Sequence, residues 1–361
     1  MVAGEDGVRQ LTIEVNSRYH QFLGDRPTIE MNTNLINRSV AVWLLVLVSA
    51  LYVSAQGTGR DQCFNFDKLS PELRKTSEEL LLRAMDHAVL YTLAGGIKPM
   101  SSGFAPYKQI STSLPSVDGT EAEAIVADLG KKEKTSLTSE EKMKLAQAES
   151  AVERAKTLKE LEDLRTILKY WRCGDEIFAD LHHYSQSNNG KRSLDIVVFS
   201  KPALQNTIRN KQDFFSRWGI TPSANPFEVI YAIEVERSTA RNAGYGYLFG
   251  YPDHAVEFFV KASDSENMTG HFVKREFLSI PTVLHPKNAF VYAVPVGHQT
   301  NSADIAIKEK AAPIFAEYTK RREEYIGDGK KGIVALVRDW FCGENGQCTP
   351  SQPKNSSSAG K

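Results

Sequence analysis

Apolar residues recur every three or four positions through the first half of this chain, and this spacing predicts helices. A capping serine followed by proline begins one helix, which is expected over residues 70–96 and ends at a diglycine. A capping box formed by Thr138 and Glu141 begins a longer, highly charged helix that extends to about Trp171. We expect this helix to pack on its own domain, because its alanine-rich apolar stripe would make a weak coiled coil.

The pattern changes after residue 193, where compact apolar runs alternate with shorter helical segments. The runs predicted to be strands cover residues 194–199, 227–236, 272–283 and 289–296, of which the last two form a hairpin. The segments predicted to be helices cover residues 202–217, 239–249, 252–262, 302–326 and 333–341. Because the strands are few and no regular βαβ alternation occurs, the predicted fold class is α+β. The helical N-terminal half, with its long charged helix, would pack on a small mixed or antiparallel sheet.

The same reading divides the chain into regions. We expect a mainly helical region over residues 56–185 and an α+β region over residues 186–348, which could together form one domain. The tail over residues 349–361 contains few apolar residues and is expected to be disordered.

The most apolar stretch of the chain lies at residues 40–55. At sixteen residues it is shorter than the ~20 that a membrane-spanning helix needs. It follows a basic residue and ends in Val53-Ser54-Ala55, which predicts a signal peptide over residues 31–55 that is cleaved before Gln56. Residues 1–30 would then precede the true translation start at Met31, and an uncleaved anchor is the alternative interpretation.

Charge and composition narrow the classes of partner. Lys plus Arg and Asp plus Glu each total 44, so the formal net charge is zero, which argues against a nucleic-acid-binding protein. The hydrophobic fraction of 41% suffices for an ordinary core. We therefore expect an unidentified small or polar ligand, no nucleic acid, and no stable membrane span in the mature chain.

The four cysteines favour disulfides, because an even number in an exported chain is typical of oxidised pairs. Cys342 and Cys348 flank a short glycine-containing loop and are predicted to pair locally, which leaves Cys63 for Cys173. A zinc site is the competing interpretation, but the spacings match no zinc-binding pattern.

No common nucleotide-binding, zinc-protease or serine-hydrolase motif occurs, so candidate chemistry rests on small groups of residues. Glu234 and Glu236 end the predicted strand 227–236, where alternation would place both carboxylates on one face about 7 Å apart. Paired carboxylates can perform acid–base catalysis or bind a cation. The alternative is that they lie on the solvent-exposed face of a sheet.

His254 and Glu257 are spaced i,i+3 at the start of a predicted helix and can share one face. They are the candidate ligands for a divalent metal such as zinc or manganese. We expect residues 250–257 to border the functional cleft, with His254 facing Glu234 and Glu236. The alternative gives His254 only a surface role beside the helix cap.

Two further groups are weaker candidates. Asp180, His182 and His183 could bind a metal, but at a helix end the neighbouring histidines would point about 100° apart. Lys98, followed by Ser101 and Ser102, permits a serine–lysine pair with either serine for nucleophilic catalysis, although the order differs from the known motif.

Two function classes follow. The first is an exported binding or structural protein that acts outside the cytoplasm. The second is a hydrolytic enzyme, metal-dependent if the histidine binds a cation, in which Glu234, Glu236, His254 and Glu257 form the catalytic cluster.

Overall fold

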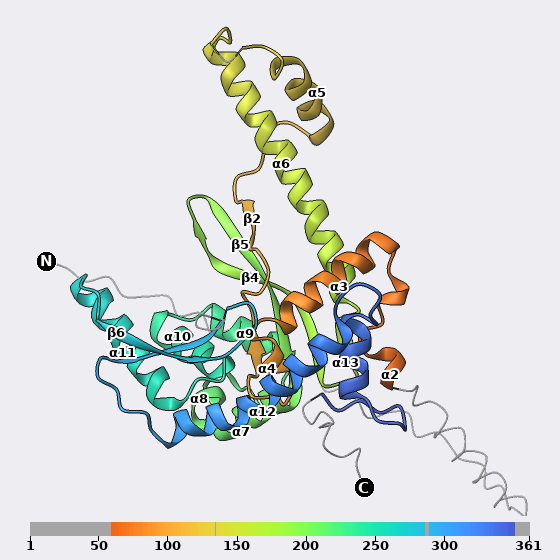
Figure 1. Cartoon of the computed structure of the whole chain (residues 1–361). Coiled ribbons are helices and arrows are strands. Elements are labelled where there is room, and N and C mark those ends of the chain that lie inside the picture. Colours follow the sequence, from red (N-terminus) through yellow and green to blue (C-terminus); the bar gives the residue numbers. More distant parts are fainter. Residues whose placement is uncertain (1–58, 134, 286–288, 351–361) are drawn as a thin grey trace, which may run out of the picture. The chain divides into compact units, whose positions relative to one another are not determined.

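The computed structural model describes residues 59–133, 135–285 and 289–350 (Figure 1). The predicted signal peptide (residues 31–55), the preceding segment 1–30 and nearly all of the expected tail lie outside these residues. Among the helices described, none combines the length and the apolar character needed to cross a membrane.

The fold is α+β, as predicted, with two antiparallel sheets. The five-stranded sheet has the order β1-β5-β4-β3, and β2 also pairs with β5. Its strands are β1 (Met100–Ser101), β2 (Lys108–Ser111), β3 (Arg172–Cys173), β4 (Ile177–Asn188) and β5 (Lys191–Ser200). The second sheet is the predicted hairpin, formed by β6 (Arg275–Ile280) and β7 (Phe290–Pro295). The larger sheet therefore comes mostly from residues before 194, not from the expected range 194–296.

The helices of the first half of the chain are α2 (Gly59–Gln62), α3 (Pro71–Met85), α4 (Leu90–Leu93), α5 (Gly119–Leu129) and α6 (Ser139–Leu168). Those of the second half are α7 (Lys201–Asn210), α8 (Gln212–Phe215), α9 (Pro226–Glu234), α10 (Ser238–Leu248), α11 (Asp253–Thr269), α12 (Ser302–Tyr325) and α13 (Ile333–Phe341). Short 3-10 turns lie at Phe66–Lys68 and Ser216–Trp218. The predicted capping box of α6 is present: the Thr138 hydroxyl accepts from Glu141 N, and the Glu141 carboxylate accepts from Thr138 N.

The predicted strand 227–236 is wrong, because this segment forms α9. Asn225 caps the helix by accepting a hydrogen bond from Phe227 N, and Pro226 occupies the first turn. Val229, Ile230 and Ile233 are buried together at helical spacing. The run is apolar enough to be read with either period, and the cap decides for the helix.

The histidine segment is also corrected, because residues 180–183 belong to β4 and not to a helix end. Strand alternation then places Asp180 and His182 on one face and His183 on the other. His182 pairs directly with Asp195 of β5.

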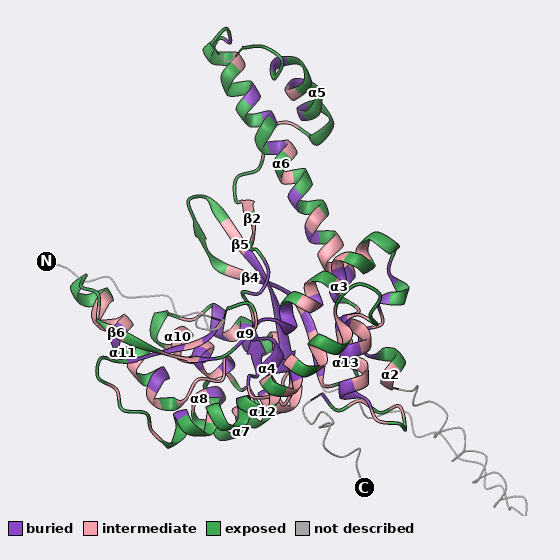
Figure 2. Cartoon of the chain, viewed as in Figure 1, coloured by how far each residue is buried: buried purple, intermediate pink, exposed green. Residues whose placement is uncertain are grey.

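The paired strands β4 and β5 separate two hydrophobic cores. Figure 2 shows that β5 is buried over most of its length, whereas β4 is buried mainly in its first half and exposed at its end. One face of β5 contributes Leu194, Ile196 and Val198 to the larger core, which also contains Trp171. The opposite face contributes Val197 and Phe199 to the second core, beside α7, α9 and α10. Because both faces are covered, β5 shows no polar alternation over residues 194–200.

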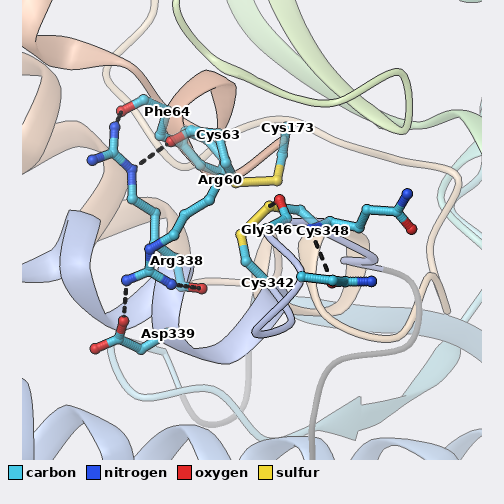
Figure 3. Close-up of a disulfide and its surroundings, with 11 residues drawn as sticks. Arg60, Cys63, Phe64, Cys173, Arg338, Asp339, Cys342, Gly346 and Cys348 are labelled. Carbon is cyan, nitrogen blue, oxygen red and sulfur yellow. Dashed lines mark hydrogen bonds and ion pairs between the residues drawn. A yellow bond between two sulfur atoms is a disulfide. The ribbon is translucent and has the colours of Figure 1, made fainter. Parts of the chain in front are cut away.

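Both predicted disulfides are present: Cys63 is bonded to Cys173, and Cys342 to Cys348. The two bonds lie side by side (Figure 3), with three of the sulfur atoms within 4.8 Å of one another. Because these sulfurs are oxidised, they do not form a thiolate metal site. Arg338 of α13 donates to the Cys63 carbonyl at 2.8 Å and so holds the segment around Cys63 against α13.

We expect the two disulfides to contribute unequally to stability. The first closes a loop with a sequence separation of 110 and the second a loop with a separation of 6. The loop-entropy relation then assigns about 5 kcal/mol to the first bond and about 2 kcal/mol to the second. Paired alanine variants at Cys63/Cys173 and at Cys342/Cys348, compared by urea unfolding, measure the difference. Equal losses, or the reverse order, would contradict this expectation.

Candidate functional site

A pocket with a volume of about 270 Å³ lies between α10, α11 and the β6–β7 hairpin. Aromatic and aliphatic side chains make up most of its lining. The lining residues are Asn242, Tyr245, Gly246, Phe249, Tyr251, Ala255, Val256, Phe259, Phe277, Val291, Tyr292 and Ala293. Small-molecule sites are commonly apolar concavities with few polar groups, so this pocket is the first candidate for a binding site.

Two glycines fix the backbone around the pocket. A Cβ atom at Gly246 would lie 2.8 Å from a Val256 methyl group, so the glycine lets α10 and α11 approach closely. Gly250 has a φ of +74°, and a Cβ atom there would lie 2.8 Å from the Ile97 carbonyl oxygen. The connection from α10 to α11 therefore packs against the loop that carries Lys98.

The polar groups of two pocket tyrosines are already occupied. Tyr245 donates its hydroxyl hydrogen to Glu234 Oε2 at 2.5 Å. Tyr292 donates to Asp304 Oδ1 at 2.7 Å. Burial is the largest cause that raises the pKa of each tyrosine, followed by its carboxylate partner. Because both hydroxyl hydrogens are donated to carboxylates, neither tyrosine has a hydrogen left to donate to a ligand.

Asp304 is the centre of a cluster beside the pocket. Its carboxylate is fully buried and accepts hydrogen bonds from Tyr292, from the His298 ring at 2.8 Å and from Asn301 N at 3.0 Å. Burial, the largest single effect, raises the pKa of Asp304, but the hydrogen bonds together lower it to about 2. Asp304 is also the third residue of α12, where it forms a capping box with Asn301.

His254 and His298 approach this carboxylate from different segments. His254 lies in the first turn of α11, and His298 follows β7. Their rings are stacked, with centroids 5.0 Å apart and planes inclined by 8°. His254 Nε2 lies 3.2 Å from Asp304 Oδ1. Two imidazoles and one carboxylate are a donor set suited to zinc, manganese or iron.

A second buried polar network surrounds Glu234, the residue that accepts the hydrogen bond from the Tyr245 hydroxyl. Glu234 is 2% exposed and accepts hydrogen bonds from Ser185 N at 2.7 Å and from the Ser185 hydroxyl at 2.8 Å. Arg241 lies 3.2 Å from the same carboxylate, and His182 Nε2 is 2.9 Å from the Tyr245 hydroxyl. Burial raises the pKa of Glu234 most. The nearby His182, whose Nε2 lies 3.7 Å from Oε2, and the hydrogen bonds from Tyr245 and Ser185 together lower this pKa to about 2.

The sequence candidates are thus distributed over different places. Glu234 belongs to the buried network, whereas Glu236 accepts a hydrogen bond from Trp218 Nε1. His254 belongs to the Asp304 cluster, and none of its described hydrogen bonds or ion pairs involves Glu234 or Glu236. Glu257 is exposed and lies 4.0 Å from Lys261, outside the cluster that contains His254. Because α9 replaces the expected strand, the two glutamates do not share a face through strand alternation.

Lys98 is almost completely buried, with 2% of the residue exposed. Its ammonium donates to the Phe249 carbonyl at 3.0 Å and lies 4.1 Å from the centre of the Phe290 ring. Burial lowers the pKa of Lys98 to about 7. Among the described hydrogen bonds none joins Lys98 to Ser101 or Ser102, and the Ser101 hydroxyl bonds instead to Thr92 at 2.8 Å.

Sequence reasoning missed Tyr245, Tyr292, His298 and Asp304. The spacing of Asn301 and Asp304 is a capping-box signal that marks the start of α12. No comparable local signal marks the other three residues. They reach the site through contacts between segments distant in the sequence.

The two glutamates should differ in their importance for folding. Glu234→Gln leaves several buried donors without a carboxylate, so we expect the free energy of unfolding to fall by about 3 kcal/mol or more. Glu236→Gln keeps an oxygen that can accept from Trp218, so the free energy of unfolding should change by less than about 0.5 kcal/mol. Urea unfolding of the matched pair measures both values. Similar losses in the two variants would refute the structural role assigned to Glu234.

Lys98 should make stability depend on pH. Above pH 7 the folded chain releases the Lys98 proton while the unfolded chain, with its pKa near 10.5, retains it, so stability rises with pH over this window. Between pH 7 and 9.5 we expect the free energy of unfolding to increase by more than about 1.4 kcal/mol, which is a tenfold change in the folding equilibrium constant. Lys98→Met should abolish this contribution and be at least as stable as the wild type at pH 7. Urea unfolding across this range tests the prediction, and an unchanged pH slope in the variant would exclude Lys98 as the cause.

The pocket and the two polar networks beside it are the structural features from which a function can be inferred. Comparison of the chain with protein-family models, with curated proteins and with solved structures found no match. The function must therefore be inferred from the site geometry itself.

Proposed function

We propose that this protein binds a small, largely apolar molecule in the pocket between α10, α11 and the β6–β7 hairpin, and that it acts outside the cytoplasm. The observation that carries the proposal is the pocket lining. Its surface is formed mainly by aromatic rings and aliphatic side chains, and its two best-placed hydroxyls already donate to Glu234 and Asp304.

The size and the rim of the pocket support the same conclusion. A volume of about 270 Å³ lies just below the range of about 300–1,000 Å³ for small-molecule sites, so the pocket suits a small ligand. Phe259 and Phe277, on facing elements of the rim, remain 39% and 60% exposed. Exposed aromatic side chains beside a concave apolar surface are common at ligand sites, because a ligand can cover them.

The proposed location rests on the disulfides. Two disulfides in one chain are typical of proteins that mature in an oxidising compartment. The apolar segment at residues 40–55 and its predicted cleavage before Gln56 would supply the route for export.

The second candidate function remains a hydrolytic enzyme. One observation favours it: the His254, His298 and Asp304 cluster shares Tyr292 with the pocket, so chemistry at the cluster would occur close to a bound molecule. This interpretation requires an activated water or metal that the binding function does not need.

Prodan, a small neutral naphthalene dye whose emission shifts in apolar surroundings, tests the binding proposal. We expect one saturable site per chain in the wild type. Ala293→Phe should weaken binding at least tenfold, because Ala293 lines the pocket and the added ring occupies the same space.

Ala240→Phe is the matched control, since Ala240 lies on α10 but lines a different surface hollow. This variant should bind prodan as the wild type does. Absence of a saturable site in the wild type, or equal binding by both variants, would reject this pocket as the binding site.

A further inference from the structure

We propose that His254, His298 and Asp304 bind one divalent transition-metal ion. This inference is independent of the ligand proposed for the pocket. It begins with geometry: three segments bring one ligand atom each to within 4.8 Å of the others. On a tetrahedral ion with bonds of 2.0–2.1 Å, ligand atoms lie about 3.3 Å apart. The carboxylate oxygens already lie 3.2 Å from His254 Nε2 and 2.8 Å from His298 Nε2. These two separations are close to the tetrahedral value, and the ligand atoms of the two histidines lie within 4.8 Å of each other.

A buried nitrogen without a hydrogen bond provides a second observation. His254 Nε2 is buried and has no hydrogen-bond partner among the described residues, although Asp304 lies nearby. A buried polar atom without a partner is costly. A metal ion at this nitrogen would remove that cost.

Charge balance points in the same direction. The Asp304 side chain is 0% exposed, and within the described ranges its ion-pair partners are the two histidines, with no lysine or arginine among them. When both imidazoles are in the neutral form that binds a metal ion, neither of these partners offsets the buried negative charge. The N-termini of α11 and α12 place partial positive charges nearby. A full carboxylate charge in direct contact with the ion outweighs these partial charges.

The surroundings hold the ligands in position and leave both rings partly exposed. Tyr292 and Asn301 N each donate to one Asp304 oxygen, which fixes the carboxylate. The His254 and His298 side chains are 26% and 13% exposed. The two rings therefore contact solvent, whereas the His254 nitrogen that would bind the ion is itself buried.

Asn301 sets the strength of this site. Its side-chain oxygen caps α12, so its amide nitrogen faces His254 Nδ1 at a distance of 3.2 Å. Metal binding at Nε2 moves the imidazole proton to Nδ1, where it meets a donor and not an acceptor. Asn301→Asp keeps a good helix cap and supplies an acceptor for that proton. The variant should therefore bind metal more tightly than the wild type.

The test uses the full chain without an affinity tag, treated with a chelator and titrated with Zn²⁺ by calorimetry and with Co²⁺ by visible absorption. We expect one ion per chain and Co²⁺ bands typical of nitrogen and oxygen ligands. His254→Ala and His298→Ala should each weaken binding at least about 100-fold, and Asn301→Asp should strengthen it about tenfold. His271→Ala, which removes an exposed histidine, is the control and should bind normally.

Melting temperatures decide whether a loss of binding reflects the site or the fold, and His298→Gln provides a second variant of similar size. The proposal is overturned if the wild type binds neither ion stoichiometrically. It is equally overturned if folded His254 and His298 variants bind as the wild type does, or if Asn301→Asp weakens binding.

Discussion

The antiparallel pairing of β4 with β5 is the interaction on which the rest of this structure depends. β5 is paired on both edges and covered on both faces, so its backbone groups are satisfied within the sheet while its side chains enter two cores. The larger core includes the disulfide-linked segment around Cys63 and the buried face of α13. The second core positions α9 and α10, and through them one wall of the pocket. A change in the register of this strand pair would exchange the two sets of side chains.

Local signals in the sequence were sufficient for much of the fold. The caps at Ser70 and Thr138, the hairpin 272–296 and both cysteine pairs depend on residues whose effect is mostly local or whose number leaves few alternatives. Two segments were misread for a common reason. The segment ending at Glu234 is apolar on most sides, and β4 changes from buried to exposed along its length. Neither therefore presents a clear period. The Asn225 cap favours the helix in the first segment, and pairing with β5 makes the second a strand.

The site shows the same limit more strongly. His254 could be singled out because it opens a helix after a glycine-rich connection, but its neighbours His298 and Asp304 lie more than forty residues further along the chain. The carboxylate that a helical spacing suggested, Glu257, is exposed instead. Composition and spacing carry no information about which helix start faces which loop. That information arises only when α11, β7 and α12 pack together.

The long helix α6 has a consequence for how the molecule fluctuates. Its first half packs with α5 around a small hydrophobic cluster that includes Ala122, Leu145 and Ala148. This cluster is separate from the larger core. Its last turns, with Leu161 and Leu168, belong to the larger core. The unit formed by α5 and the first half of α6 can therefore unfold and refold locally without exposing Trp171. Backbone amides along one continuous helix would then exchange with solvent at very different rates, fast near Leu145 and slow near Leu168.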